Sequence, residues 1–295
     1  MRVTQSMILR STLQRVNDNR DEMNDIQRRI ATKKKVEKAS DDPVSFSRSA
    51  RFRKTLRQNN QYLRNVNDAN AWTNMSSTGT EQLYEYAMKA VEHGIEAVDG
   101  KTTGDVRDVL IESIRGLLQE SVSQANSQYM GKSIFAGTLT HEGEPFVLTG
   151  DVVTYQGNDE RIERRVSQTQ TEQINITGQQ IMDSGYFDAL TALIGALEID
   201  DLDEARNQIE NLRSAENVIL GLSSNLASTR SSLEMIENRL NKDNLNLTKY
   251  ISENEDASLE EEYVRFNAEQ ITYQAALQSA SEIMNMSIMD YWSVT

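Results

Sequence analysis

The 295-residue chain has no cysteine, only two prolines and only two histidines, and aromatic residues make up 6% of it. The absence of cysteine excludes disulfides and thiolate metal sites. Few prolines and few aromatics, together with abundant Ala, Leu, Glu, Gln, Arg and Lys, favour long helices over a compact globule. The composition therefore predicts a mainly α protein.

The charge and the apolar pattern exclude two classes of partner. The formal net charge is -14, whereas phosphate binding requires a surplus of Lys and Arg on one surface. No run of consecutive apolar residues is long enough to cross a bilayer. The first residues also lack the apolar stretch of a cleaved signal peptide. We therefore expect no nucleic acid partner and no membrane insertion, and either a cytosolic location or export without a cleaved signal.

The residues of an active site are missing from the sequence. His93 and His141 have no second potential ligand at metal-binding spacing, and no phosphate loop, dinucleotide fingerprint or nucleophile elbow is present. The acidic pairs Asp41-Asp42 and Asp200-Asp201 stand where helices need caps, so capping outweighs a catalytic interpretation. We predict no catalytic, cofactor-binding or metal-binding residues, and a protein that is not an enzyme.

A heptad repeat is the clearest regularity of the C-terminal half. The repeating positions are Leu212, Ile219, Leu226, Leu233, Leu240 and Leu247. A weaker second line follows three residues after each of them. Asp201 and Glu204 have the spacing of a capping box, so one helix is predicted from about Asp201 to Glu253. Helical patterns after Pro43 and after Gly104 supply partners for it, and three helices can share one core.

Heptad lines also mark both ends of the chain. One line in the first segment and two interleaved lines in the last predict two helices with apolar stripes. Because a monomer offers little surface to cover them, the stripes imply self-assembly or a partner. The predicted assembly interface consists of Leu9, Val16, Met23, Ile30, Tyr263, Phe266, Tyr273, Leu277 and Met284.

Charge favours antiparallel pairing of these two terminal helices. Residues 1–40 carry ten Lys or Arg against five acids, and residues 252–295 carry nine acids against the single Arg265. A hairpin would bring the basic run 33–35 close to the acidic run 260–262. Exposed ion pairs contribute at most about 1 kcal/mol each, so they would set the register of pairing and add little stability. Solvated faces are an equally good interpretation of both runs.

Helix breaks and a β-rich stretch divide the chain. Asp42 before Pro43 reads as a helix start, and Ser258 with Glu261 reads as another. Short β-branched or aromatic runs closed by glycine occur at 134–137, 146–150, 152–155 and 174–178. The predicted domains are an inner coiled coil (1–42 plus 258–295), a helical rod (43–132 plus 183–257) and a β-rich outer insertion (133–182). The predicted fold is a long antiparallel helical rod or coiled coil with a small β-rich insertion.

Several motifs in chain order resemble the bacterial flagellin family. They are the opening MRVT, SDDP at 40–43, GKSIFAGT at 131–138, YQG at 155–157 and YQAALQSA at 273–280. Flagellin itself typically has alanine where this chain has Pro43, and its opening is more apolar and Asn-rich. The chain therefore resembles the hook-filament junction branch of the family more than the filament subunit.

The resemblance implies a discontinuous flagellin-like architecture and a structural role between hook and filament. It also implies self-assembly into a ring or helix, contact with hook-associated protein 1 and flagellin, and type III export with a cytoplasmic chaperone. The terminal helices would be loosely held or unfolded in the monomer and would order on assembly. Two alternatives remain, namely flagellin itself and an unrelated cytosolic coiled-coil scaffold. The scaffold has no reason to carry the β-rich stretch.

Overall fold

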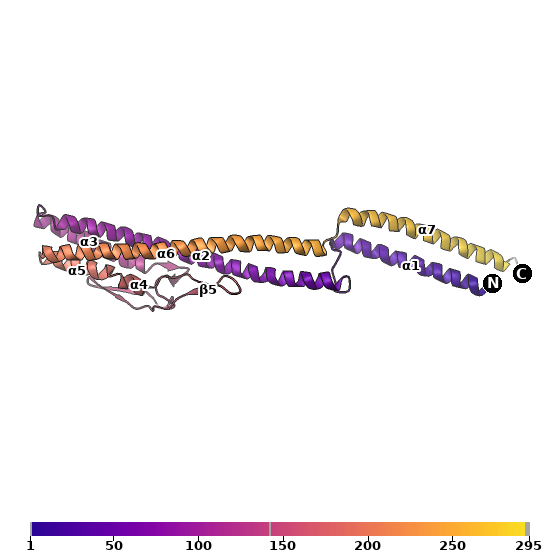
Figure 1. Cartoon of the computed structure of the whole chain (residues 1–295), viewed down its shortest axis with the longest axis horizontal. Coiled ribbons are helices and arrows are strands. Elements are labelled where there is room, and N and C mark those ends of the chain that lie inside the picture. The colour runs from indigo at the N-terminus through magenta and orange to yellow at the C-terminus, as the bar shows by residue number, and fades with distance from the viewer. Residues whose placement is uncertain (1, 142, 293–295) are drawn as a thin grey trace. The chain divides into compact units, whose positions relative to one another are not determined.

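Long helices dominate the computed structural model, which describes the backbone of residues 2–141 and 143–292 and the side chains of residues 7–141 and 143–284 (Figure 1). The helices of this described part are α1 (Arg2–Thr32), α2 (Pro43–Ala97), α3 (Gly104–Ala125), α4 (Gly178–Asp183), α5 (Tyr186–Glu198), α6 (Leu202–Glu255) and α7 (Leu259–Trp292). The chain forms two compact units, residues 1–57 with 244–295 and residues 58–243. The mainly α prediction is confirmed.

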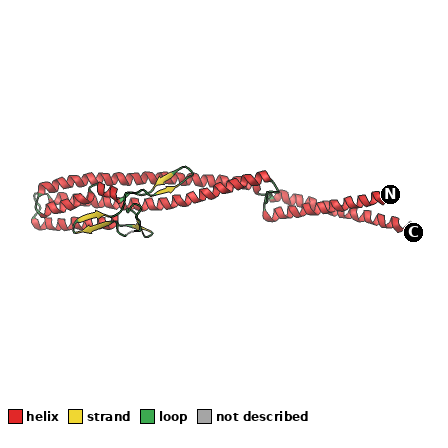
Figure 2. Ribbon diagram, turned by 90° about the horizontal axis from the view of Figure 1, so that it is seen from below, coloured by secondary structure: helices red, strands yellow, loops and turns green. Residues whose placement is uncertain are grey.

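In the first unit, α1 and α7 pair along their length and run antiparallel (Figures 1 and 2). Where α1 ends and α7 begins, the Ala257 amide donates to the Lys33 carbonyl at 3.0 Å. One turn further into both helices, Arg29 meets Glu262. The predicted antiparallel pairing of the two ends is therefore confirmed.

Side-chain caps fix the predicted helix starts. The Asp42 carboxylate accepts from the amides of Val44 (2.9 Å) and Ser45 (3.1 Å), and Pro43 occupies the first helical position. Asp201 accepts from the Glu204 amide at 3.0 Å, which starts α6. Ser258 accepts from the Glu261 amide at 3.5 Å, which starts α7. The capping function assigned to Asp42, Asp201 and Ser258 is confirmed.

The second unit has a core built from α2, α3, α5 and α6. The members of the heptad line from Leu212 to Leu240 are all buried, because α6 turns that face toward α2. The two helices run antiparallel, since Asn70 contacts Glu237 while Gly94 lies against Ile209. Helix α5 is apolar on nearly all sides and is buried against α3.

Three antiparallel strand pairs stand beside this helical core (Figure 2). They are β1 (Gln128–Tyr129) with β2 (Lys132–Ser133), β3 (Phe146–Thr149) with β4 (Val152–Tyr155), and β5 (Glu163–Arg165) with β6 (Thr171–Gln173). The register of β3 and β4 pairs Phe146 with Tyr155. Both members of this hairpin follow the sequence prediction.

The strands predicted at 134–137 and 174–178 are wrong. Both segments are buried and irregular, with Phe135, Ile174 and Ile176 filling the core. Their backbone groups bond singly to other segments, as when the Gly178 amide donates to the Phe135 carbonyl at 2.6 Å. The β-branched and aromatic residues of these segments indicate that the segments are buried. They do not form strands, because no neighbouring strand pairs with them through a ladder of backbone hydrogen bonds.

Candidate assembly surface

An apolar seam runs along α1 at heptad spacing. Between residues 7 and 30 the shielded side chains at heptad spacing on this helix are Leu9, Thr12, Val16, Asn19, Met23, Ile26 and Ile30, and Arg28 and Arg29 beside them are also partly shielded. Their alternating spacing of three and four residues is that of an antiparallel coiled-coil face. Val16 and Ile26 are the most buried of them. The seam therefore faces α7, the helix that pairs with α1.

The matching seam on α7 has the same spacing and includes carboxylates. Its shielded residues are Leu259, Glu262, Phe266, Glu269, Tyr273, Ala276, Ala280 and Ile283. Glu262 is buried and pairs with Arg29 at 3.1 Å. A buried carboxylate needs such a partner, because an unpaired charge there would lose its hydration without compensation. The pair fixes the register at this end of the coiled coil.

A second row of apolar side chains on α7 has no cover within the described chain. We call it the outer stripe, and it consists of Tyr263, Val264, Ile271, Leu277 and Met284. Val264 is 70% exposed and Ile271 is 67% exposed. Tyr263, Leu277 and Met284 lie beside the seam, each at the heptad position directly after a seam residue, whereas Val264 and Ile271 are seven residues apart on the face of α7 opposite the seam. Several large apolar side chains exposed along one helix are typical of a surface that another chain covers.

The predicted assembly residues thus fall into two groups. Leu9, Val16, Met23, Ile30, Phe266 and Tyr273 are shielded in the seams between α1 and α7. Tyr263, Leu277 and Met284 belong to the exposed outer stripe. Heptad spacing detects both groups but does not separate them. It did not predict Val264 and Ile271, which are among the most exposed members of the stripe. That all nine residues form the assembly interface stays a prediction.

In the same unit, a cluster of charged side chains links the end of α6 to the end of α1 and the start of α2. Glu255 is 2% exposed, and its carboxylate accepts from Lys34 at 3.2 Å and from Arg53. Its backbone carbonyl also accepts from the amide of Lys35 at 2.7 Å. The basic run 33–35 is therefore bound to the end of α6, and the expected pairing with residues 260–262 is made by Arg29 instead.

The loop from α1 to α2 is held by a second carboxylate. The amides of Lys38 and Glu37 both donate to the Asp41 carboxylate at 2.9 Å. These two hydrogen bonds lower the pKa of Asp41 below its ordinary value, and Arg28 nearby acts in the same direction. Asp41 and Asp42 therefore serve the backbone of the loop and of α2, which accounts for the acidic pair that sequence alone could also relate to catalysis.

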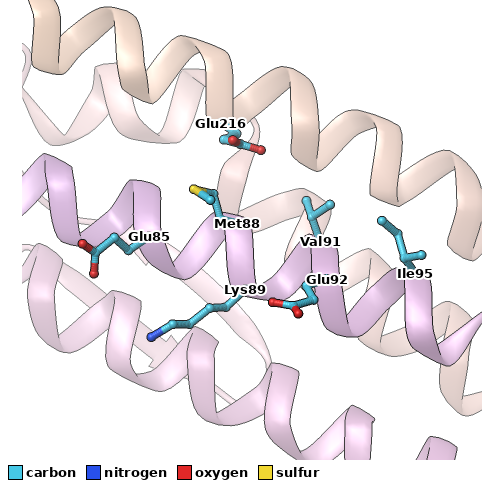
Figure 3. A pocket seen from close by; sticks show the side chains of 7 residues that line it. All are labelled: Glu85, Met88, Lys89, Val91, Glu92, Ile95 and Glu216. Atoms are coloured by element: carbon cyan, nitrogen blue, oxygen red, sulfur yellow. The ribbon is translucent and has the colours of Figure 1, made fainter.

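The second unit has a groove between α2 and α6 of about 560 Å³ (Figure 3). Met88, Val91 and Ile95 point from α2 toward the helix that carries Glu216. Glu85, Lys89 and Glu92 lie on the adjacent side of α2 and do not point toward that helix. Met88 is 48% exposed and Ile95 is 45% exposed. The groove is apolar in its floor and mostly acidic at its rim.

The remaining candidates for chemistry are isolated in the structure. His93 is half-buried on α2 and His141 is exposed. Among the side chains of residues 7–141 and 143–284, no group of three His, Asp or Glu is placed to hold a metal ion. In the same residues, no helix combines the length and the apolar character needed to cross a bilayer.

Comparison with known proteins gives one consistent family. Residues 3–140 match the bacterial flagellin N-terminal helical region. The chain is 27% identical over 186 residues to Flagellar hook-associated protein 3 of Salmonella typhimurium, covering 62% of this chain and 57% of that protein. The chain therefore spans a little more than half the length of this curated relative. The resemblance to the flagellin family is confirmed.

Solved structures share the fold. FlgL of Bacillus cereus superposes with a TM-score of 0.60 at 18% identity, covering 68% of this chain and 98% of that one. The flagellar junction protein FlgL of Legionella pneumophila gives a TM-score of 0.58 at 14% identity, covering 71% and 100%. These similarities show that the chain shares the fold of the two solved proteins.

Proposed function

We propose that this chain, which is homologous to Flagellar hook-associated protein 3, forms the junction between hook and filament by helical self-assembly. The outer stripe of α7 carries the proposal. Val264 and Ile271 are more than two-thirds exposed on a helix whose other apolar face is already covered by α1. Contact with neighbouring subunits would remove this apolar surface from water, which favours association.

The proposed partners are other copies of the chain, hook-associated protein 1 on one side and flagellin on the other. A cytoplasmic type III export chaperone would cover the stripe before export, because an exposed apolar helix face invites non-specific association. The protein would reach the outside of the cell without a cleaved signal peptide. In the monomer α1 and α7 would be only loosely held, and they would gain stability when subunit contacts add to the seam.

The two alternatives predict different behaviour. Filament subunits polymerise in large numbers, so a flagellin would form long filaments on its own. A cytosolic scaffold would stay inside the cell. The observation that favours the junction role is the similarity to Flagellar hook-associated protein 3 and to a structure described as a flagellar junction protein.

The test is complementation of a motile bacterium that lacks its own hook-associated protein 3. The full chain should restore filaments, whereas the double variant Val264→Ser and Ile271→Ser should lose most of them, because it removes apolar area from the outer stripe without touching the seam. Val109→Ser on α3 is the matched control, since Val109 is as exposed as Val264 but lies outside the terminal helices. Filaments counted by electron microscopy at normal levels for the double variant would refute the role of the stripe.

A further inference from the structure

The groove between α2 and α6 is an apolar depression that none of the preceding functions uses. Its floor is formed by Met88, Val91 and Ile95, and its volume of about 560 Å³ is enough for several side chains. Met88 and Ile95 remain nearly half exposed although they sit beside the buried core of the unit. A surface of this kind gains stability when another molecule covers it.

The rim restricts which molecule fits. Three carboxylates, those of Glu85, Glu92 and Glu216, line the groove against one cation, Lys89. None of the ion pairs identified among the described residues involves any of these four groups. The rim therefore favours an occupant that combines an apolar side chain with cations, because opposite charges steer encounter and like charges oppose it.

The start of α2 in the first unit has that combination. Residues 44–57 contain Arg48, Arg51, Arg53, Lys54 and Arg57 and no acid at all. Val44, Arg48 and Arg51 follow the spacing i, i+4, i+7, so they share one face of the helix. Val44 is 66% exposed, and both arginines are exposed. This face, an apolar residue followed by two cations, is the basic face of α2.

We infer that the groove between α2 and α6 binds the basic face of α2 from a second copy of the chain. Val44 would rest on Met88 and Ile95, while Arg48 and Arg51 would meet the rim carboxylates. The inference rests on the proposed self-assembly and deepens it by naming a contact outside the terminal helices.

The contact has a consequence for the form of the assembly. Groove and basic face are different surfaces of the chain, so one copy offers its groove to a neighbour and its basic face to the next. A contact between two different surfaces can continue from copy to copy into a ring or a helical array, as the proposed self-assembly requires. The basic face also explains how a chain of net charge -14 can approach its own copies.

The absence of cysteine makes the contact directly measurable. A Val44→Cys chain mixed with a Met88→Cys chain of different mass should form a disulfide-linked mixed dimer under mild oxidation in excess over either like-with-like dimer, because the introduced cysteines carry the only thiols present. Met235→Cys replaces Met88→Cys in the control, since Met235 is an equally replaceable exposed methionine on α6 outside the groove. All variants are full-length chains, and circular dichroism checks that they fold.

Charge reversal then tests the recognition. Glu85→Lys with Glu92→Lys should lower the yield of the linked dimer roughly fivefold or more, and Arg48→Glu with Arg51→Glu on the other copy should restore it. A yield for Val44→Cys with Met88→Cys no higher than with Met235→Cys would overturn the inference, as would failure of the paired reversal to restore the yield.

The outcomes separate this contact from the proposed function. If the unmodified chain restores filaments in the complementation assay while the cysteine pair gives no specific link, the junction role stands and the groove contact is wrong. If the cysteine pair links specifically while the chain restores no filaments, the copies associate as inferred and the junction role is wrong.

Discussion

Gly79 and Phe135 should be coupled so strongly that the effect of Gly79→Ala on the free energy of unfolding changes sign when Phe135 is replaced. Gly79 lies within α2, and a Cβ atom placed there would be 2.9 Å from Cζ of Phe135 and 3.0 Å from its Cε2. Phe135 is fully buried, and its carbonyl accepts from the Tyr155 hydroxyl and the Gly178 amide. The ring therefore has little freedom to move away.

The magnitude follows from two opposing effects. Alanine in place of a glycine inside a helix stabilises by about 0.5–1 kcal/mol. Overpacking of a tight core costs typically about 1–3 kcal/mol. Gly79→Ala should therefore lower the free energy of unfolding in the natural chain. In a Phe135→Leu background the ring is gone, so the same substitution should raise it by about 0.5–1 kcal/mol.

Urea unfolding followed by tryptophan fluorescence measures both cases. Trp72 is buried in the second unit, and Trp292→Phe removes the only other tryptophan. The double-mutant cycle should give a coupling free energy of at least about 1 kcal/mol. Stabilisation by Gly79→Ala in both backgrounds, or simple additivity, would refute the contact between helix and loop that the structure shows.

Three further outcomes are expected. Hydrogen bonds from the Ser45 hydroxyl and from two amides lower the pKa of Asp42, so its capping contribution is present above its unfolded pKa near 3.8 and is lost as the pH falls through the lower folded value. The protection of those two amides, measured against their intrinsic exchange rates, should therefore fall below pH 3.8 in the natural chain and should lose this pH dependence in Asp42→Asn. Ser121→Ala should cost about 1–3 kcal/mol in urea unfolding because it leaves the buried Tyr186 hydroxyl without its 2.6 Å partner, whereas Tyr186→Phe should cost less. Leu233→Ala in the seam of α6 should cost about 2–5 kcal/mol, and Met235→Ala two residues away should stay within about 0.5 kcal/mol.

The heptad periodicity of apolar residues predicted the long helices well, because each of these helices buries one face on which apolar residues repeat. The heptad line of α6 is buried from Leu212 to Leu240, and Asp201 caps its start as the spacing indicates. Residue type predicted the strands less well. Ile134 and Ile174 have strand-like neighbours, but they fill a core whose shape depends on segments far away in the sequence.

Which stripe of a helix faces which neighbour also required the structure. On α7, the carboxylate of Glu262 lies in the seam while Val264 lies outside it, the reverse of what apolarity alone predicts. The reason is Arg29 on the opposite helix, which compensates the buried charge. The predicted domain boundaries near residues 42 and 258 remain a prediction, although the helices do break there.

The central claim is that the terminal helices are completed by assembly. Hydrogen exchange on the purified full chain tests it most directly by comparing amides in α1 and α7 with those between Leu212 and Leu240 in α6. The account predicts rapid exchange in both terminal helices, slow exchange in α6, and protection of α1 and α7 once the chain has assembled. Equal and strong protection of all three helices in the monomer would contradict it and would favour a self-contained coiled-coil scaffold.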